Sequence, residues 1–360
     1  MKAKLKDVVC IITDKKSSSL IDVNNYVSTE NILPNREGIR FPAKSLPRIS
    51  KILSYQKNDV LVSNIRPYFK KIWFSDRDGV RSNDVLAFRT KNSNILLQKY
   101  LYLLLQSDKF FDYVTLTAKG TKMPRGDKKA ILNFTFELPS ISTQKKLTNY
   151  FFVIESLIKL NNLINDNLLD IAKNIYHRIL FSSQITKTNL RSFATVVMGQ
   201  SPSSKTYNEN KIGIPLLNGA ADFRNGIQPS KWTTDPKIIV NKGAYIFGVR
   251  ATIGLTAKVS KPYAIGRGTG SAIPKDVNNE EILYFILNDM FKKFEQTESG
   301  SVYINISKND FENYRFNIPD RNGLLFFHEK VKPIMDQIYI NKKQNKILQT
   351  IKATLLSKIF

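Results

Sequence analysis

An internal repeat constrains the fold of this 360-residue chain more than any other feature of the sequence. Four blocks recur in the same order. The paired blocks are residues 27–39 with 215–227, the segment around Arg66 with that around Arg250, residues 101–105 with 283–287, and residues 120–139 with 300–319. The offset falls steadily from 188 to 180 along these pairs, as loops of unequal length would cause. We therefore predict two diverged copies of one structural unit.

A long helical pattern follows each copy. In the first copy, steps of four and three residues connect apolar positions and two asparagines, which predicts a heptad seam. These positions are Leu147, Phe151, Ile154, Ile158, Asn161, Asn165, Leu168, Ala172, Ile175 and Ile179. The second seam consists of Val331, Ile334, Ile338, Asn341, Asn345, Leu348, Lys352, Leu355 and Ile359, each at an offset of 180 from its counterpart. Each helix would be about 60 Å long at about 1.5 Å per residue.

The two asparagines in each seam are informative because a polar residue in an apolar seam costs stability but fixes register and partner. We predict that the two helices pair antiparallel, since a globular domain between them provides the return path. The alternative is that each helix packs only on its own domain. The residues expected to set the register are Ile158, Asn161, Asn165, Leu168, Ile338, Asn341, Asn345 and Leu348.

The predicted fold class is α+β, with two mixed α/β domains joined by two long antiparallel helices in a coiled coil with pseudo-twofold repetition. The predicted divisions are domains at 1–139 and 183–319 and helices at 140–182 and 320–360. Short β-rich runs such as VLVSNI, DVLAFRT, KIIV, AYIFGVR and TAKVS predict strands. Residues 100–111 and 280–294 are expected to be helical. Strand and helix do not alternate regularly, which argues against a doubly wound sheet.

The charge balance suggests a polyanionic partner. Lys and Arg total 55 against 30 Asp and Glu, giving a formal charge of +25 and a pI near 9.9. A compositional bias toward lysine is the alternative explanation. The first residues are too charged for a signal peptide, and no run approaches the ~20 apolar residues that a membrane span needs. Cys10 is the only cysteine, so an internal disulfide is excluded. A cytoplasmic protein without membrane contact is expected.

Basic residues in loops are the candidate DNA contacts, because Lys and Arg neutralise phosphates and Arg can also bind guanine. The DNA-binding candidates are Arg66, Lys70, Lys71, Lys119, Lys122, Arg125, Lys128, Ser201, Arg224, Arg250 and Arg267. Arg66 and Arg250 are favoured because they are repeat-equivalent. For each of them, an ordinary solvated or structural charge is the alternative. The glycine-rich segment 266–271 could touch a phosphate or merely turn the chain.

Catalytic and metal-binding motifs are not found in the sequence. It has no P-loop, no HExxH and no dinucleotide fingerprint. His177 and His328 are isolated and are expected on helix surfaces or interfaces. Asp59 with Asp84, or Glu295 with Glu298, could form a nuclease pair, but Asp59 has Gly243 as its repeat counterpart. We therefore expect no catalytic site, no metal and no cofactor in this chain.

The quoted blocks resemble the specificity (S) subunits of Type I restriction-modification systems over nearly the whole chain. YVSTENILPNREGI, SNIRPYFKKIWF, SNDVLAFR and GTKMPRGDKKAI are similar to one class of target recognition domain. MGQSPSSKTYN, GIPLLNGAADF, FGVRATIG and YAIGRG are similar to another. LPSISTQKKL and the helix after it resemble the central conserved region, with Pro139 and Gln144 kept. The corresponding entry to the second helix, IPDRNGLLFFHEKV, departs from that pattern.

This resemblance implies a non-catalytic subunit that reads double-stranded DNA. Each recognition domain would read one half of a split, asymmetric target. The helices would set the gap and dock two methyltransferase (M) subunits, and through them restriction (R) subunits. S-adenosylmethionine, ATP and Mg would be bound only by those partners. The alternatives are a stand-alone or spare S-like DNA-binding protein, a DNA-modifying enzyme with a cryptic site, and an RNA-binding scaffold.

Overall fold

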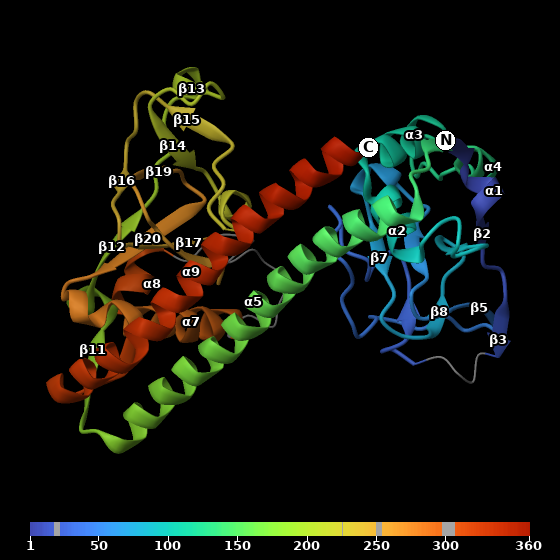
Figure 1. The fold of residues 1–360 in the computed structure, drawn as a ribbon. Helices are drawn as coiled ribbons and strands as arrows, with labels where there is room; N and C mark the ends of the chain where they lie inside the picture. The colour runs from blue at the N-terminus through green and yellow to red at the C-terminus, as the bar shows by residue number, and fades with distance from the viewer. Residues whose placement is uncertain (18–21, 225, 250–253, 297–306) are drawn as a thin grey trace. The chain divides into compact units, whose positions relative to one another are not determined.

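The computed structural model describes residues 1–17, 22–224, 226–249, 254–296 and 307–360. The chain divides into two units. The first unit comprises Met1–Asn161 with Lys343–Phe360, and the second comprises Asn162–Lys342. Two long helices, α5 (Ile141–Ser182) and α9 (Arg321–Ile359), each contribute to both units (Figure 1). The second unit is therefore one continuous segment, whereas the first is assembled from both ends of the chain.

The first unit is built on two small sheets. The first sheet has the antiparallel order β2 (Val9–Ile11), β9 (Val85–Thr90), β6 (Val60–Ser63), β7 (Ile72–Phe74). The second sheet has the order β3 (Lys15–Ser17), β5 (Lys51–Tyr55), β8 (Gly79–Arg81), β4 (Tyr26–Val27), with β4 and β8 parallel. Alternate residues of β6 and β9 pack in opposite directions, as expected of strands. Val62 and Phe88 pack with the helices, whereas Leu61 and Ala87 pack with Tyr55 of the second sheet.

The second unit repeats the first sheet strand for strand and three strands of the other sheet. Its first sheet has the order β12 (Ala194–Met198), β20 (Thr269–Pro274), β17 (Tyr245–Gly248), β18 (Thr256–Lys258). Its other sheet has the order β13 (Tyr207–Asn208), β15 (Lys231–Thr233), β14 (Ile214–Leu217), β19 (Tyr263–Ile265), β16 (Ile239–Val240). In that other sheet, β16, β19 and β14 correspond to β5, β8 and β4 of the first unit, and β14 and β19 are parallel like β4 and β8. The predicted duplication and the predicted α+β class are thereby confirmed, as are the strands expected from the five β-rich runs.

A two-stranded ribbon closes each unit and leads into its long helix. The ribbons pair β1 (Lys2–Lys4) with β10 (Thr135–Glu137), and β11 (Ile185–Asn189) with β21 (Arg315–Pro319). Short helices flank the ribbons: α1 (Leu5–Val8) and α4 (Lys128–Leu132) in the first unit, α6 (Leu190–Phe193) and α8 (Lys308–Asn313) in the second.

The helix expected at residues 100–111 is two helices, so this prediction is wrong in detail. The two helices are α2 (Gln98–Gln106) and α3 (Asp108–Leu116), and Ser107 lies between them as the cap of both. Ser107 has extended backbone angles, and its hydroxyl accepts a hydrogen bond from the Phe110 N–H at 3.2 Å. A serine N-cap favours a helix start, and it overrides the apolar periodicity that runs through this position. The second unit has the expected continuous helix, α7 (Glu280–Gln296).

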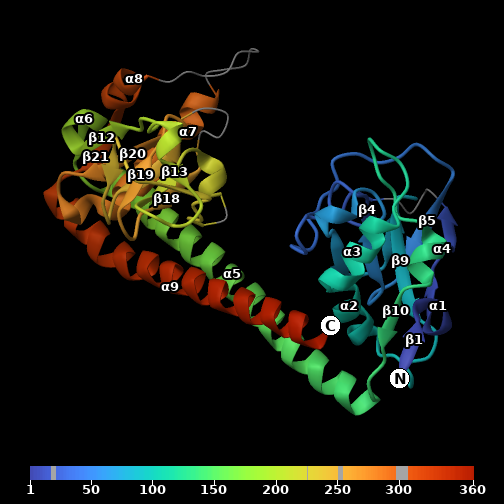
Figure 2. The same ribbon diagram turned by 90° about the horizontal axis from the view of Figure 1, so that it is seen from above.

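The long helices lie side by side within each unit (Figure 2). In the first unit, Glu155 of α5 contacts Lys352 of α9; in the second, Asn165 contacts Asn341. Residue numbers rise along one helix as they fall along the other, so the packing is antiparallel, as predicted. The last turns of α9 also pack on the core of the first unit, where the Tyr100 and Phe360 rings are 5.9 Å apart.

The start of α5 is fixed by the fully buried Gln144. Its side-chain amide donates to the carbonyls of Ile95 and Pro139, both at 2.9 Å, and accepts from the Leu97 N–H at 2.9 Å. Leu324 occupies the equivalent position of α9 and packs with apolar residues instead. Within the described part of the chain, no helix is long and apolar enough to cross a membrane.

Candidate nucleic-acid interface

The basic loop before α4 forms a tight hairpin in the first unit. Lys119 and Arg125 exchange two backbone hydrogen bonds of 2.8 and 2.9 Å. The Lys119 ammonium contacts the Asp127 carboxylate at 2.6 Å, and the Arg125 guanidinium contacts Asp84 at 3.2 Å. Both basic side chains stay mostly exposed, at 80% and 56%, so these pairs orient the charges without removing them from solvent.

These side chains line a surface concavity of about 390 Å³. Its lining residues are Asn64, Asn83, Asp84, Lys119, Arg125, Gly126, Asp127 and Lys128. The structure therefore brings together three of the predicted cations, Lys119, Arg125 and Lys128. Lys122 is exposed on the hairpin but does not line the concavity.

Arg66, Lys70 and Lys71 lie around one short 3-10 turn, η2 (Pro67–Phe69). Arg66 and Lys70 flank the turn with positive φ angles of 48° and 51°. The Arg66 N–H donates to the Pro124 carbonyl at 2.8 Å, which connects this turn to the basic hairpin. The rings of Tyr68 and Phe69 are exposed on the turn, with centroids 4.7 Å apart.

Both lysines of this turn have protein partners. The Lys70 ammonium and the Arg36 guanidinium contact the same oxygen of Asp108. Hydrogen bonds from the two cations hold the pKa of the Asp108 carboxyl below its usual value. The Lys71 ammonium donates to the Thr29 carbonyl, and burial lowers its pKa. In this arrangement the two lysines organise the surface loops, and a bound phosphate would compete with those contacts.

In the second unit, Ser201 and Arg267 are in contact, although 66 positions separate them in the sequence. The Arg267 N–H donates to Ser201 Oγ at 3.2 Å, and that hydroxyl donates to Asn218 Oδ1 at 3.2 Å. The two glycines beside Arg267 pack directly against Asn218. A Cβ on Gly266 would lie 2.0 Å from Asn218 Oδ1, and one on Gly268 would lie 2.6 Å from its carbonyl oxygen. The backbone carrying the exposed Arg267 is thereby fixed.

The remaining candidates of the second unit are Arg224 and Arg250. Arg224 is exposed and pairs through its backbone with Gly226. Arg250 lies outside the described residues. Within the segment 266–271, residues 266–268 turn the chain between β19 and β20, and residues 269–271 begin β20. The Thr269 N–H donates to the Gly266 carbonyl at 2.9 Å.

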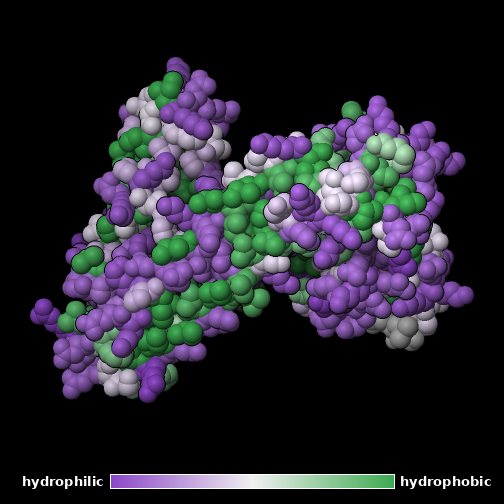
Figure 3. All heavy atoms as spheres, viewed as in Figure 1, coloured by the Kyte–Doolittle hydropathy of each residue, from purple (hydrophilic) through white to green (hydrophobic). Residues whose placement is uncertain are grey.

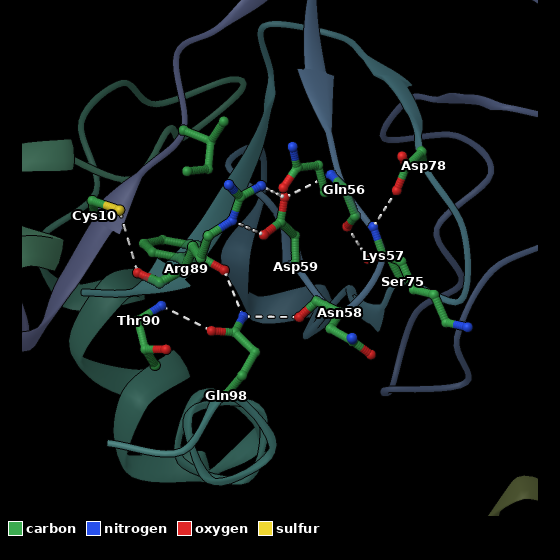
Figure 4. A network of polar contacts seen from close by, with 12 residues as sticks. Cys10, Gln56, Lys57, Asn58, Asp59, Ser75, Asp78, Arg89, Thr90 and Gln98 are labelled. Carbon is green, nitrogen blue, oxygen red and sulfur yellow. Dashed lines mark hydrogen bonds and ion pairs between the residues drawn. The ribbon is translucent and has the colours of Figure 1, made fainter. Parts of the chain in front are cut away.

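Asp59 and Asp84, the first acidic pair considered for a nuclease, are each held by a separate arginine. Asp59 is 1% exposed, and Arg89 binds both of its oxygens at 2.7 and 2.8 Å (Figure 4). Asp84 contacts Arg125 instead. Glu298 lies outside the described residues. Over the described ranges, no three His, Cys, Asp or Glu side chains gather as a metal site.

The two histidines occupy different environments. His328 Nδ1 lies 2.6 Å from an oxygen of Glu281, which is 2% exposed. This contact joins α9 to α7, so His328 has a structural partner. His177 is exposed on α5, with its ring 5.4 Å from that of Tyr176.

The four seam asparagines hydrogen-bond in two pairs. In the first unit, Asn161 Nδ2 donates to Asn345 Oδ1 at 2.9 Å. In the second unit, Asn341 Nδ2 donates to Asn165 Oδ1 at 2.9 Å. The repeat offset of 180 relates Asn161 to Asn341 and Asn165 to Asn345, so each pair is the repeat counterpart of the other. Ile158, Leu168, Ile338 and Leu348 are buried or half-buried in the same seam.

One seam position differs between the units. In the first unit, Lys352 contacts Glu155 at 2.6 Å and lies 4.9 Å from the ring centroid of Phe151. The repeat counterparts of Lys352 and Glu155 are Ala172 and Met335, which pack in the apolar core of the second unit. An ion pair in the first unit therefore stands at the position where the second unit has apolar side chains.

A second apolar stripe lies on the exposed face of α5, at steps of three, four and seven residues. It consists of Tyr150, Val153, Leu157, Leu160, Ile164 and Ile171, each between 38% and 61% exposed. On α9, Phe326, Ile340, Ile347 and Ile351 are 47–54% exposed with similar periodicity. Apolar side chains are visible along both helices in Figure 3. Contiguous exposed apolar surface of this kind is typical of protein–protein interfaces.

Comparison with known proteins gives matches that extend over most of the chain. The family model described as "Type I restriction modification DNA specificity domain" matches residues 1–170 and again 183–355. The HindI specificity subunit of a Type I restriction enzyme from Haemophilus influenzae is 22% identical, with 88% of each chain covered. The MjaVIII specificity subunit from Methanocaldococcus jannaschii is 22% identical and covers 98% of this chain and 90% of its own. A crystal structure of a Type I S subunit from M. genitalium has the same fold, with a TM-score of 0.65 at 14% identity, covering 100% of this chain and 96% of its own.

Proposed function

The chain belongs to the family of Type I restriction-modification DNA specificity proteins, and on this premise we propose that it reads a bipartite, asymmetric DNA target without a catalytic site of its own. Each domain would read one half of the target. The observation that carries this proposal is that the family model matches twice, once over each copy of the repeat.

The differences between the two copies support separate half-sites. The units share the strand order of the first sheet and three strands of the second, but their surface loops carry different side chains. The first has a hairpin with Lys119, Lys122 and Arg125, and the second has a glycine-flanked Arg267. Two domains of the same fold with different contact residues would bind two different base sequences. The formal charge of +25 favours attraction to the phosphates of both.

The helix pair is proposed to set the gap between the half-sites and to dock two methyltransferase subunits. The buried asparagine pairs favour one register, and a fixed register holds a spacer at one length. The exposed stripes on α5 and α9 are the proposed docking surfaces. Two positions of the stripes repeat at the offset of 180, Leu160 with Ile340 and Ile171 with Ile351, which suits two identical partners. Restriction subunits would join through those partners. S-adenosylmethionine, ATP and Mg are proposed to bind only in those partner subunits.

Mapping of DNA methylation tests the bipartite reading. In a host carrying the complete system, residues 1–139 are exchanged for the corresponding domain of another family member. We expect one half of the methylated sequence to change while the other half and the gap stay constant. A change in both halves, or in neither, would contradict the assignment of one half-site to each domain.

Methyl-transfer assays test the absence of catalysis. The purified chain is incubated with duplex DNA and labelled methyl donor, alone and with the modification subunits. We expect transfer only with the subunits added. Methylation by the chain alone would show a cryptic active site and overturn the proposal.

Charged substitutions in the seam test the spacer and docking role. Ile158→Lys or Ile338→Lys places a charge in the helix interface, which should disturb partner docking and gap length more than base choice. Copurification with modification subunits and methylation mapping measure the two effects. Normal docking with an unchanged gap would argue against a spacer role for the helices.

A further inference from the structure

The turn between β8 and β9 and the turn between β19 and β20 occupy equivalent places in the two units. In the first unit, the Ser82 N–H donates to the Val27 carbonyl at 2.8 Å, and the Val85 N–H donates to the Ser82 carbonyl at 3.2 Å. In the second unit, the same two bonds run from Gly266 to Leu217 and from Thr269 to Gly266, both at 2.9 Å. The offset is 184 for Ser82 to Gly266 and for Val85 to Thr269. The two turns are therefore one structural feature, repeated.

The exposed residue of this turn is Asn83 in the first unit and Arg267 in the second. Neither side chain has a hydrogen bond or ion pair with another described residue, so both are available to a ligand. Their backbones, in contrast, are fixed. The Asp84 N–H donates to Ser82 Oγ at 3.1 Å, and the Arg267 N–H donates to Ser201 Oγ at 3.2 Å. A rigid turn with an unengaged polar side chain suits recognition, because little backbone freedom is lost on binding.

Cations accompany the turn in each unit. Asn83 shares its concavity with Lys119, Arg125 and Lys128. In the second unit, the Asn218 N–H beside Arg267 donates to Asp222 at 2.9 Å, and Arg224 is exposed two positions further along the chain. The lysines and arginine around Asn83 match the usual division of a DNA interface, in which phosphate contacts position the protein and base contacts specify sequence.

Resting on the proposed reading of DNA by both domains, we propose that Asn83 and Arg267 are equivalent base-reading residues, Asn83 for an adenine in one half-site and Arg267 for a guanine in the other. An asparagine amide can donate to adenine N7 and pair with its N6 amino group, whereas an arginine fork donates to guanine N7 and O6. The same turn would thus read a different purine in each domain because its one exposed side chain differs.

Binding to modified bases tests this assignment on the folded wild-type chain. Methylation mapping first gives the target, and each adenine and guanine in a duplex target is then replaced by its 7-deaza form, which lacks the N7 acceptor. We expect the 7-deaza replacement of one adenine in the half-site read by residues 1–139 to reduce affinity by about 5- to 150-fold. The replacement of one guanine in the other half-site should reduce affinity by the same factor.

Variant proteins then identify the residue responsible for each effect. Asn83→Ala should become insensitive to 7-deazaadenine at that one position and keep its sensitivity to 7-deazaguanine in the other half-site. Arg267→Ala should show the reverse pattern. Asn94→Ala and Arg315→Ala, at exposed positions elsewhere in the same units, serve as matched controls and should keep both sensitivities.

The outcomes separate this inference from the proposed function. A bipartite target with unchanged modified-base sensitivities in both variants would overturn the assignment of Asn83 and Arg267 while leaving the proposed function in place. A wild-type chain with no bipartite target would overturn the proposed function itself. In each variant, the half-site read by the unchanged domain serves as an internal measure of folding, and loss of modified-base sensitivity in that half-site would reveal misfolding. The wild-type scan would then decide. If it finds no sensitive adenine in the half-site read by residues 1–139, or no sensitive guanine in the other half-site, the inference is overturned.

Discussion

Asn165 and Asn341 form a buried hydrogen bond of 2.9 Å between α5 and α9, with 7% and 5% of their surfaces exposed. Gln337 Nε2 supplies a second bond, to Asn341 Oδ1 at 2.8 Å. Both atoms of the Asn341 amide and the Asn165 oxygen therefore have hydrogen-bond partners in this seam, and a polar pair with such partners specifies register at limited cost.

Removing one member of this pair should destabilise the second unit. In Asn341→Leu, the Asn165 oxygen loses its donor, and an unpaired buried polar group costs about 1–3 kcal/mol. The double variant Asn165→Leu with Asn341→Leu should recover part of the loss, because no orphaned amide remains between those two positions. Urea unfolding measures both, with Asn174→Leu on the exposed face of α5 as the control. Equal losses in the single and double variants would show that the pair is not coupled.

The Glu155–Lys352 ion pair should behave as one coupled element. The two side chains are only 24% and 17% exposed, and the Tyr102 hydroxyl donates to the same carboxylate oxygen at 3.4 Å. We expect Glu155→Met and Lys352→Ala each to lower stability. Together they reproduce the Met335–Ala172 contact of the second unit, and the coupling should be about 0.5–3 kcal/mol in a double-mutant cycle. Lys358→Ala, near the end of the same helix, should have little effect. Strictly additive losses would refute this coupling.

The Asp108 cluster predicts a pH dependence of stability. The pKa of this carboxyl is lowered by hydrogen bonds from Lys70 and Arg36. A carboxyl with a depressed pKa in the folded state stabilises the protein above its unfolded pKa of about 3.9, and this contribution is lost as the pH falls through the folded value. Asp108→Asn should therefore lower the melting temperature at neutral pH, and the difference from wild type should shrink below about pH 4. A difference that stays constant down to acidic pH would exclude the ionised carboxylate as its cause.

DNA affinity should depend steeply on salt if the loops contact phosphates. With about 6–10 phosphates neutralised, affinity should fall by about 10³- to 10⁵-fold between 50 and 200 mM salt. Equilibrium binding of the full chain to its duplex target across this range gives the slope. Lys122→Ala removes an exposed cation whose side chain has no ion pair with another described residue, and it should reduce the slope by about one unit if Lys122 contacts a phosphate. A flat dependence would argue against direct DNA reading.

The repeat and the helix pair were predictable because both appear in the sequence as periodic patterns of residues. The spacing alone was enough to pair the four seam asparagines, because antiparallel helices with matched seams have few alternative registers. These residues are Asn161, Asn165, Asn341 and Asn345. The strands followed from local runs of β-branched and aromatic residues. The break at Ser107 was missed because a cap is a local polar contact, and the apolar pattern continues through it.

The candidate interface was less accessible to sequence reasoning. The contact of Lys70 with Asp108 joins residues 38 positions apart, and the Ser201–Arg267 contact spans a still longer separation, so tertiary structure alone decides which cations are engaged. Asn83 was missed because a single asparagine in a turn is ordinarily there for its backbone conformation. The available signal was its alignment with Arg267 at the offset of 184, which becomes meaningful once the two turns are seen to be equivalent.

The division of α9 between the units has a consequence for how the protein is made. The chain is synthesised from its amino-terminal side, yet the core around Tyr100 includes Leu356 from the last turn of α9, and Phe360 directly after the helix packs against it. The second unit is the continuous segment Asn162–Lys342, so all of it is synthesised before Lys343–Phe360. The first unit is therefore begun before the second and completed after it, and a chain that stops after Lys342 would lack the contacts of Leu356 and Phe360 with the core around Tyr100.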